Sequence, residues 1–148
     1  MNAKVLITGG TGLVGTRLTQ LLQAKGYTVT HLSRSVSGNE NVKTYQWNIE
    51  KKELDLEALI GVDYIIHLAG AGIADKRWTD QRKELILKSR TESTKLLQNS
   101  ILKLDNHTIK AFISASAVGY YGIDTGDTWM TEEIPSGDGF AAEVTRQW

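Results

Sequence analysis

The sequence contains no cysteine, which excludes a disulfide scaffold, a thiolate metal site and a cysteine nucleophile. Proline is scarce as well, with Pro135 as the single example among 148 residues. A surplus of charge of one sign is also missing, because 17 basic side chains balance 17 acidic ones. Nucleic acids and anionic membranes usually attract a basic surplus, so we expect neither of them as the main partner.

No apolar run is long enough to cross a bilayer, since the longest mostly apolar stretch, residues 62–74, is interrupted by Asp63 and His67. The first residues lead directly into strand-like sequence, without the pattern of a secretion signal. We therefore expect a cytoplasmic protein whose partner is a small-molecule substrate. The 3 histidines show no metal-ligand spacing with an acidic residue, so we expect no metal site.

Short apolar runs alternate along the chain with segments of helical spacing. The runs predict strands over residues 5–8, 28–33, 42–47, 64–68 and 111–114. The spacing predicts helices over residues 13–26, 54–60, 79–104 and 140–148. This alternation favours an α/β fold with a parallel sheet and right-handed crossovers, formed by residues 1–148 as one domain. Because the last helical pattern is unfinished at Trp148, we expect the chain to be the N-terminal portion of a longer protein.

A glycine cluster directly follows the first predicted strand. Gly9, Gly12 and Gly15 stand where this strand passes into the first predicted helix. In a dinucleotide-binding site, such glycines permit a tight turn, and the backbone N–H groups at the helix N-terminus hold the pyrophosphate. We therefore predict a dinucleotide site here. The alternative is a glycine-rich turn that only lets the helix pack closely on the strand.

The end of the second predicted strand distinguishes NADP from NAD. An NAD site usually places an acidic residue about 20 residues beyond the glycines, where it binds the ribose 2′-hydroxyl. Residues 28–38 contain no acid, and they offer the Ser33 hydroxyl and the Arg34 guanidinium instead. Because a guanidinium matches the geometry of a phosphate, we predict NADP, with NAD the less favoured cofactor. The alternative for Arg34 is an ordinary solvated loop arginine.

Several motifs together resemble the extended short-chain dehydrogenase/reductases. Within that superfamily, the chain is most similar to the NAD-dependent epimerase/dehydratase-like "epimerase family" branch. The motifs are Thr8-Gly9-Gly10-Thr11-Gly12-Leu13-Val14-Gly15, His67-Leu68-Ala69-Gly70, Arg77-Trp78-Thr79, Lys88-Ser89-Arg90 and the run from Ser114 to Gly122. The resemblance implies a Rossmann-type, doubly wound parallel sheet with strand order 3-2-1-4-5. It also implies a further C-terminal segment, beyond these residues, that carries most of the substrate site.

The resemblance also implies which residues contact the cofactor. The three motif glycines would face the pyrophosphate, and Ser33 and Arg34 would face the ribose phosphate. Arg90 resembles the cofactor-side arginine of this branch, with a solvent-facing helix arginine as the alternative, and Asn48 stands where relatives have an adenine-side residue. The remaining members of the predicted cofactor site, taken from the first two motifs, are Thr11, Leu13, Val14, Leu68, Ala69 and Gly70.

The catalytic motif of the superfamily is incomplete in this sequence. Ser116 matches the serine that follows the fifth strand. The Tyr-x-x-x-Lys pair, in which the tyrosine transfers the proton, has no counterpart, because the last helix begins with Phe140 and continues without lysine. Tyr120 and Tyr121 are the nearest substitutes, and the alternative is that both only pack in their loop.

Two functions therefore remain in competition. The first is an NADP-binding oxidoreductase or epimerase-like protein that acts on a small substrate such as a sugar nucleotide or a carbonyl compound. The second is a non-catalytic dinucleotide-binding regulatory protein that has lost the catalytic pair. In either case, an apolar face left uncovered at the end of the chain would favour self-association.

Overall fold

The computed structural model describes residues 2–36 and 41–148, and it divides into two compact units. Unit 1 comprises Met1–Gly70 and Glu92–Ala115, and unit 2 comprises Ala71–Thr91 and Ser116–Trp148. Each unit is described by itself below. No helix in the described part of the chain is long and apolar enough to cross a membrane.

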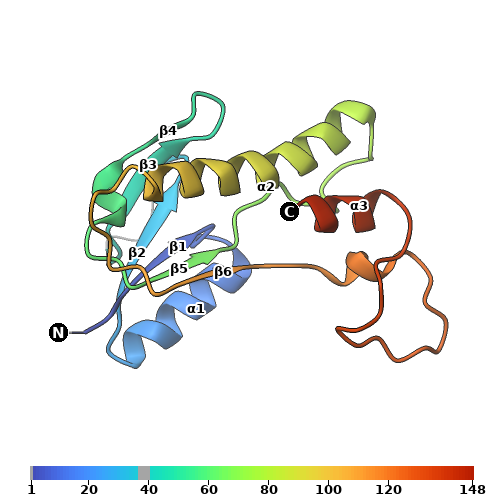
Figure 1. Ribbon diagram of the computed structural model, residues 1–148, viewed down its shortest axis with the longest axis horizontal. Helices are drawn as coiled ribbons and strands as arrows, with labels where there is room; N and C mark the ends of the chain where they lie inside the picture. Colours follow the sequence, from blue (N-terminus) through green and yellow to red (C-terminus); the bar gives the residue numbers. More distant parts are fainter. Residues whose placement is uncertain (1, 37–40) are drawn as a thin grey trace. The chain divides into compact units, whose positions relative to one another are not determined.

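A six-stranded sheet with the order β4-β3-β2-β1-β5-β6 is the centre of unit 1 (Figure 1). Its strands are β1 (Lys4–Thr8), β2 (Thr28–Ser33), β3 (Thr44–Asn48), β4 (Glu53–Leu54), β5 (Tyr64–His67) and β6 (Ala111–Ser114). Neighbouring strands are parallel except β3 and β4, which are antiparallel. The predicted Rossmann-type sheet and its 3-2-1-4-5 order of parallel strands are confirmed, and the short β4 extends one edge.

Three helices lie close to the predicted positions, one predicted helix is shorter than expected, and one 3₁₀ helix lies where the sequence predicted none. The helices are α1 (Leu13–Ala24), the 3₁₀ helix η1 (Leu56–Leu59), α2 (Asp80–Ile101), the 3₁₀ helix η2 (Val118–Tyr121) and α3 (Phe140–Gln147). The helix expected over residues 54–60 is only the single turn η1, because Leu54 pairs with Trp47 in the sheet and Ile60 is extended. Asp55 begins this turn by accepting a hydrogen bond from the Glu57 N–H at 3.0 Å.

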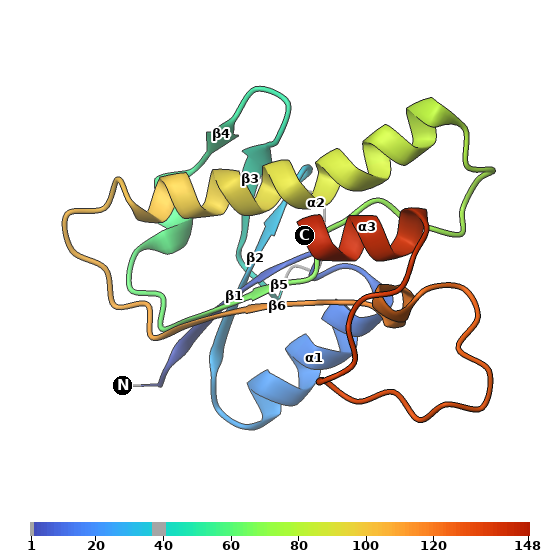
Figure 2. The same cartoon turned by 45° about the vertical axis from the view of Figure 1, so that its right-hand side comes forward.

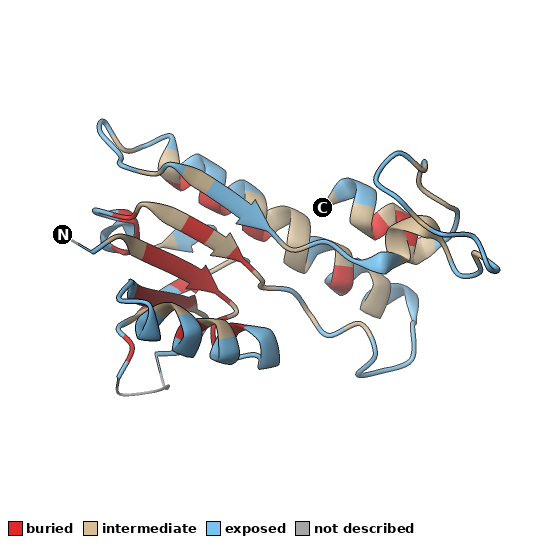
Figure 3. Ribbon diagram, turned by 90° about the horizontal axis from the view of Figure 1, so that it is seen from below, coloured by how far each residue is buried: buried red, intermediate tan, exposed pale blue. Residues whose placement is uncertain are grey.

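The central strands are covered on both faces, as the unbroken apolar run of β1 predicts, whereas the edge strand β6 is mostly exposed. On one face, Val5 and Ile7 pack with α1 residues such as Leu18. On the opposite face, Leu6 packs with Leu97 from the second half of α2 (Figures 1 and 2). Figure 3 shows the result: the central strands are buried, and the outer side of α1 is exposed. This arrangement leaves the carboxyl ends of β1, β2 and β5 at one edge of the parallel sheet.

Unit 2 combines the loop after β5, the first half of α2, η2 and α3. Trp78 and Phe140 meet edge to face with ring centroids 5.1 Å apart. Within α3, Ala142 and Val144 are buried. Arg146 donates to the Ser136 hydroxyl at 2.8 Å and to the Gly137 carbonyl at 3.0 Å, which ties α3 to the preceding loop.

Candidate dinucleotide-binding site

The glycine-rich turn connects β1 to α1 and also contacts the segment after β5. Gly9 has a φ of +70°, a conformation that glycine adopts at little cost, and its carbonyl accepts a hydrogen bond from the Gly12 N–H at 3.1 Å. A Cβ on Gly9 would lie 3.0 Å from the Ala69 nitrogen and from the Leu68 carbonyl carbon. Two predicted motifs that are about 60 residues apart in the sequence therefore lie side by side.

Different steric constraints require glycine at different positions of the turn. A Cβ on Gly10 would overlap the His31 ring, and a Cβ on Gly15 would overlap the backbone of Gly9 and Gly10. The close packing of helix on strand, which was the alternative interpretation of the motif, therefore explains these two residues. At Gly12 a Cβ would meet only the Gly9 carbonyl oxygen, at 3.3 Å, so its outer side is open to a ligand.

The N-terminus of α1 fits an anionic group. Gly12 is the N-cap residue, no side chain caps the helix, and the first turn contains no acidic residue. The N–H groups of a first helical turn have no partner within the helix, and the helix dipole makes them attractive to negative charge. Leu13 is 92% exposed and Val14 is 64% exposed, so this end of the helix is uncovered. The residues present therefore suit the pyrophosphate of a dinucleotide.

The end of β2 presents a cation to the same edge of the sheet. Arg34 is exposed, and its guanidinium has no hydrogen bond or ion pair with the described residues. Its carbonyl accepts a hydrogen bond from the Gln46 amide at 3.1 Å, which holds the backbone here against β3. Asn48, at the end of β3, accepts from the Lys51 N–H at 3.0 Å and so closes the turn toward β4. Its predicted contact with adenine remains a prediction.

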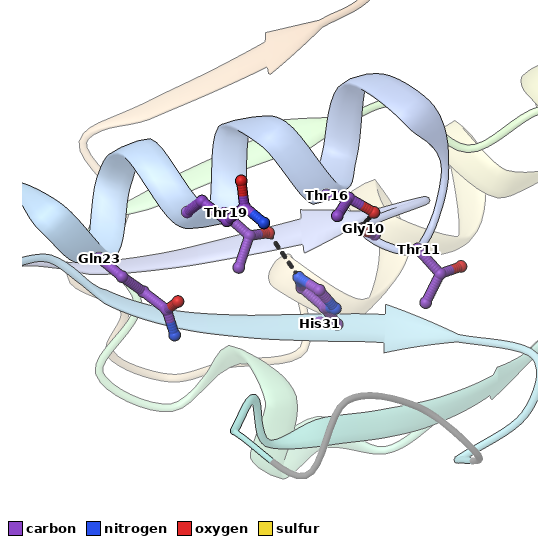
Figure 4. Close-up of a pocket in the computed structure, with 7 residues that line it drawn as sticks. Gly10, Thr11, Thr16, Thr19, Gln23 and His31 are labelled. Carbon is purple, nitrogen blue, oxygen red and sulfur yellow. Dashed lines mark hydrogen bonds between the residues drawn. The ribbon is translucent and has the colours of Figure 1, made fainter.

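A cavity of about 240 Å³ lies beside the glycine turn, between α1 and β2 (Figure 4). It is lined by Gly10, Thr11, Thr16, Thr19, Gln20, Gln23 and His31. His31 is 4% exposed and its Nε2 lies 2.8 Å from the Thr19 hydroxyl, the contact drawn as a dashed line in Figure 4. Thr19 in turn donates to the Gly15 carbonyl at 2.7 Å. Sequence reasoning missed this cavity, because nothing local in His31 indicates that it faces α1.

The second buried histidine, His67, lies at the carboxyl end of β5. Its Nδ1 is 2.6 Å from the Thr8 hydroxyl, and its Nε2 is 3.1 Å from the Ser93 hydroxyl. Burial lowers the pKa of His67 to about 4, so the ring is neutral at pH 7. Across residues 2–36 and 41–148, no three side chains of His, Asp or Glu come together in a way that could hold a metal ion.

The predicted catalytic residues belong to unit 2. Ser116 is exposed in the segment that follows β6. The Tyr120 and Tyr121 rings meet edge to face, 5.2 Å between centroids, within η2. The Tyr121 hydroxyl donates to the Thr131 carbonyl at 3.0 Å, so this phenol already has a structural partner. The roles of all three residues in proton transfer remain predictions.

The Arg90 side chain makes its contacts within unit 2, to which it belongs. Its guanidinium donates to the carbonyls of Ala71 at 3.1 Å and Ile86 at 3.0 Å, and it lies 4.9 Å from the centre of the Trp148 ring. Burial lowers the pKa of this arginine, which still leaves it charged at neutral pH. The solvent-facing alternative is therefore wrong, and a contact of Arg90 with the cofactor remains a prediction.

The fold and the glycine turn define a Rossmann-type NAD(P)-binding α/β protein. The sequence model of the NAD dependent epimerase/dehydratase family matches residues 5–142. The chain therefore belongs to this family, as the resemblance predicted.

Curated relatives include the epimerase family protein Mb2239 of Mycobacterium bovis, 37% identical over 147 residues, which cover 99% of this chain and 47% of that protein. The epimerase family protein YfhF of Bacillus subtilis is 36% identical over 146 residues, or 97% of this chain and 47% of that protein. The chain thus spans about half the length of the curated relatives that it matches.

Solved structures agree with this placement. A nucleoside-diphosphate sugar epimerase from Corynebacterium glutamicum superposes with a TM-score of 0.79 at 38% identity, covering 100% of this chain and 30% of that one. The human epimerase family protein SDR39U1 with NADPH superposes with a TM-score of 0.78 at 33% identity, covering 98% of this chain and 47% of that one. More distant neighbours below 25% identity, such as MoeE5 in complex with UDP-glucuronic acid and NAD, share the fold.

Proposed function

We propose that this chain forms the NADP(H)-binding part of an oxidoreductase or epimerase-like enzyme that acts on a small substrate, a sugar nucleotide or a carbonyl compound. The observation that carries the choice of NADP is Arg34, an exposed guanidinium at the end of β2 that has no partner among the described residues. Residues 28–38 contain no acid that could bind a ribose 2′-hydroxyl. The relative with NADPH, at 33% identity, supports the same choice.

Each group named in this proposal has a distinct task. The N–H groups at the start of α1 bind the pyrophosphate, and Arg34 binds the 2′-phosphate as a planar fork. The nicotinamide, when bound, supplies or accepts the hydride. Ser116 donates a hydrogen bond to the substrate oxygen, and Tyr120, whose hydroxyl has no partner among the described residues, transfers the proton. Tyr121 keeps the loop in place through Thr131.

A second candidate function is a dinucleotide-binding regulator without catalysis. The first turn of α3 favours it, because Phe140 stands near the place of the usual tyrosine and no lysine follows within the helix. Hydride transfer in the whole protein separates the two candidates. A panel of nucleoside-diphosphate sugars and simple carbonyl compounds, suggested by the activity named for the Corynebacterium glutamicum relative, is the appropriate set of substrates.

Titration with NADPH and NADH tests the cofactor assignment directly. We expect NADPH to bind at least about tenfold more tightly, because a charge-assisted contact contributes roughly 1.5–3 kcal/mol. Arg34→Ala should reduce this preference, whereas Lys103→Ala, which deletes an exposed cation elsewhere in unit 1, should keep it. Equal affinities in the unaltered protein would reject the NADP assignment. Self-association, cytoplasmic location and a single-domain organisation remain predictions.

A further inference from the structure

The described residues that line the cavity between α1 and β2 carry no fixed charge. Its lining consists of three threonines, two glutamines, one glycine and His31. Thr11 belongs to the glycine turn itself, so the cavity adjoins the proposed nucleotide site. A volume of about 240 Å³ corresponds to roughly eight water molecules. This is room for a phosphate group with its hydration, and it is smaller than the usual pocket for a whole drug-sized ligand.

The hydrogen bonds of His31 determine which ring nitrogen carries the proton. The Thr19 hydroxyl donates its hydrogen to the Gly15 carbonyl, so it can only accept from the imidazole. Neutral His31 is therefore protonated on Nε2, and Nδ1 is an acceptor. Nδ1 has no partner among the described residues, although the side chain is only 4% exposed.

Among the described residues that line the cavity, only His31 has a titratable side chain. In the flanking strands, its register partners are Ile7 and Thr44, neither of which titrates. Burial lowers the pKa of His31, so the cavity is uncharged at neutral pH while no ligand is bound. The charged residues of the adjoining elements, none of which lines the cavity, are Lys4, Arg17, Lys25, Arg34 and Lys43.

We propose that His31 is a specificity-determining residue for a ribose 2′-phosphate, which it binds by sharing one proton between Nδ1 and a phosphate oxygen. The proposal rests on the NADP assignment above and adds a second contact to the one proposed for Arg34. A phosphate dianion and a neutral Nδ1 are both acceptors, so they can pair only when one proton is taken up. The Nε2–H bond to Thr19 is kept in either protonation state, because both nitrogens of a charged imidazole are donors.

Proton-linked binding has a direct calorimetric test on the protein as it stands. NADPH and NADH are titrated at pH 7.5 in two buffers with different ionisation enthalpies, and the dependence of the heat on the buffer gives the protons taken up. We expect about one proton per NADPH, because the second phosphate ionisation lies near pH 6, and none for NADH. The affinity for NADPH should then fall by up to about tenfold per pH unit above pH 7.

Two variants test whether His31 is the residue that takes up the proton. His31→Gln should abolish the proton uptake and most of the pH dependence for NADPH while leaving NADH binding unchanged. His107→Gln, which removes an exposed histidine from unit 1, should behave like the unaltered protein. If His31→Gln fails to fold, the ¹⁵N shift of Nδ1 in the unaltered protein provides the same information, since it should move when NADPH binds and stay when NADH binds.

The outcomes separate this inference from the proposed function. Preference for NADPH without proton uptake, or an equal loss of both cofactors in His31→Gln, overturns the role of His31 and leaves the NADP assignment intact. Failure of NADPH to bind at all overturns the proposed function itself. Uptake of a proton that persists in His31→Gln places the linkage on another group and also overturns the inference.

Discussion

The Thr8 hydroxyl lies 2.6 Å from Nδ1 of His67, although the two residues are 59 positions apart in the sequence. Thr8 also accepts a hydrogen bond from the Ala69 N–H at 3.2 Å. Thr8, the last residue of β1 before the glycine turn, is therefore hydrogen-bonded to the last residue of β5 and to the segment that follows it. The Ser93 hydroxyl on α2 lies 3.1 Å from the other ring nitrogen of His67, Nε2.

Thr8→Val should destabilise unit 1. The substitution keeps the shape of the side chain but leaves Nδ1 of His67 and the Ala69 N–H buried or half-buried without a partner. We expect a loss of about 1–3 kcal/mol in the free energy of unfolding, measured by urea denaturation. Thr28→Val, at an exposed position of β2, is the matched control and should stay within about 0.5 kcal/mol. A Thr8→Val protein as stable as the control would contradict this account.

Acid should weaken the fold through His67. Its folded pKa of about 4 is below the ordinary value of 6.5, so the unfolded chain binds more protons between these two values. Stability therefore falls as the pH falls from about 6.5 to about 4, by up to about 3 kcal/mol from this residue. His31 acts in the same direction, since burial lowers its pKa as well. Urea unfolding at several pH values measures the slope, and an NMR titration in which the His67 ring becomes charged near pH 6.5 would refute it.

Gly12→Ala and Gly15→Ala should separate cofactor binding from folding. Gly12 has a φ of −75°, which alanine adopts, and the added Cβ meets one atom at 3.3 Å. We expect that protein to keep its stability to about 1 kcal/mol and to bind NADPH at least about tenfold more weakly. Gly15→Ala places a methyl group into the backbone of the turn, so it should unfold at lower urea despite the better helix propensity of alanine. Circular dichroism in urea and a cofactor titration measure both effects.

Thr30→Val should stabilise the protein. Thr30 is 3% exposed, and its hydroxyl has no hydrogen-bond partner among the described residues. Removing an unsatisfied buried hydroxyl should raise the free energy of unfolding by about 1 kcal/mol. Thr19→Val is the opposite case, because the Thr19 hydroxyl donates to the Gly15 carbonyl and accepts from His31. This substitution should lower the free energy of unfolding by about 1 kcal/mol. Equal effects of the two substitutions would show that the hydroxyl environments do not decide them.

Tyr120→Phe should lower the catalytic rate of the whole enzyme by about 10²–10⁴, because it removes the proposed proton donor. Ser116→Ala should mainly weaken the hold on the substrate oxygen. Tyr121→Phe should act through loop stability, since its hydroxyl donates to the Thr131 carbonyl. Steady-state kinetics on the full-length protein compare the three. Unchanged rates in all of them would exclude this loop as the source of the proton.

The five parallel strands and the glycine turn were predictable from the sequence, and the short antiparallel β4 was not. An unbroken apolar run such as that of β1 is typical of a strand buried on both faces, and a glycine cluster between a strand and a helix is typical of a dinucleotide-binding turn. The boundaries were less predictable: residues 54–60 read as a helix, yet Leu54 pairs with Trp47. A local pattern cannot show such a pairing, because it depends on where another strand ends.

The sequence by itself therefore determined the order of the five parallel strands and the place of the dinucleotide turn, since these follow from local spacing and composition. Its motifs also carried the resemblance to the family. The tertiary structure alone decided what the buried polar residues do. His31 and His67 are each unremarkable within an apolar strand, and they acquire partners only when the parallel register brings β2 against Thr19 of α1 and β5 against Thr8. Arg90 shows the same limit, because its bonds to Ala71 exist only once the loop after β5 has folded back along α2. The physical reason is that a hydrogen bond needs two groups within about 3 Å, and chain connectivity does not specify that distance for residues far apart in sequence.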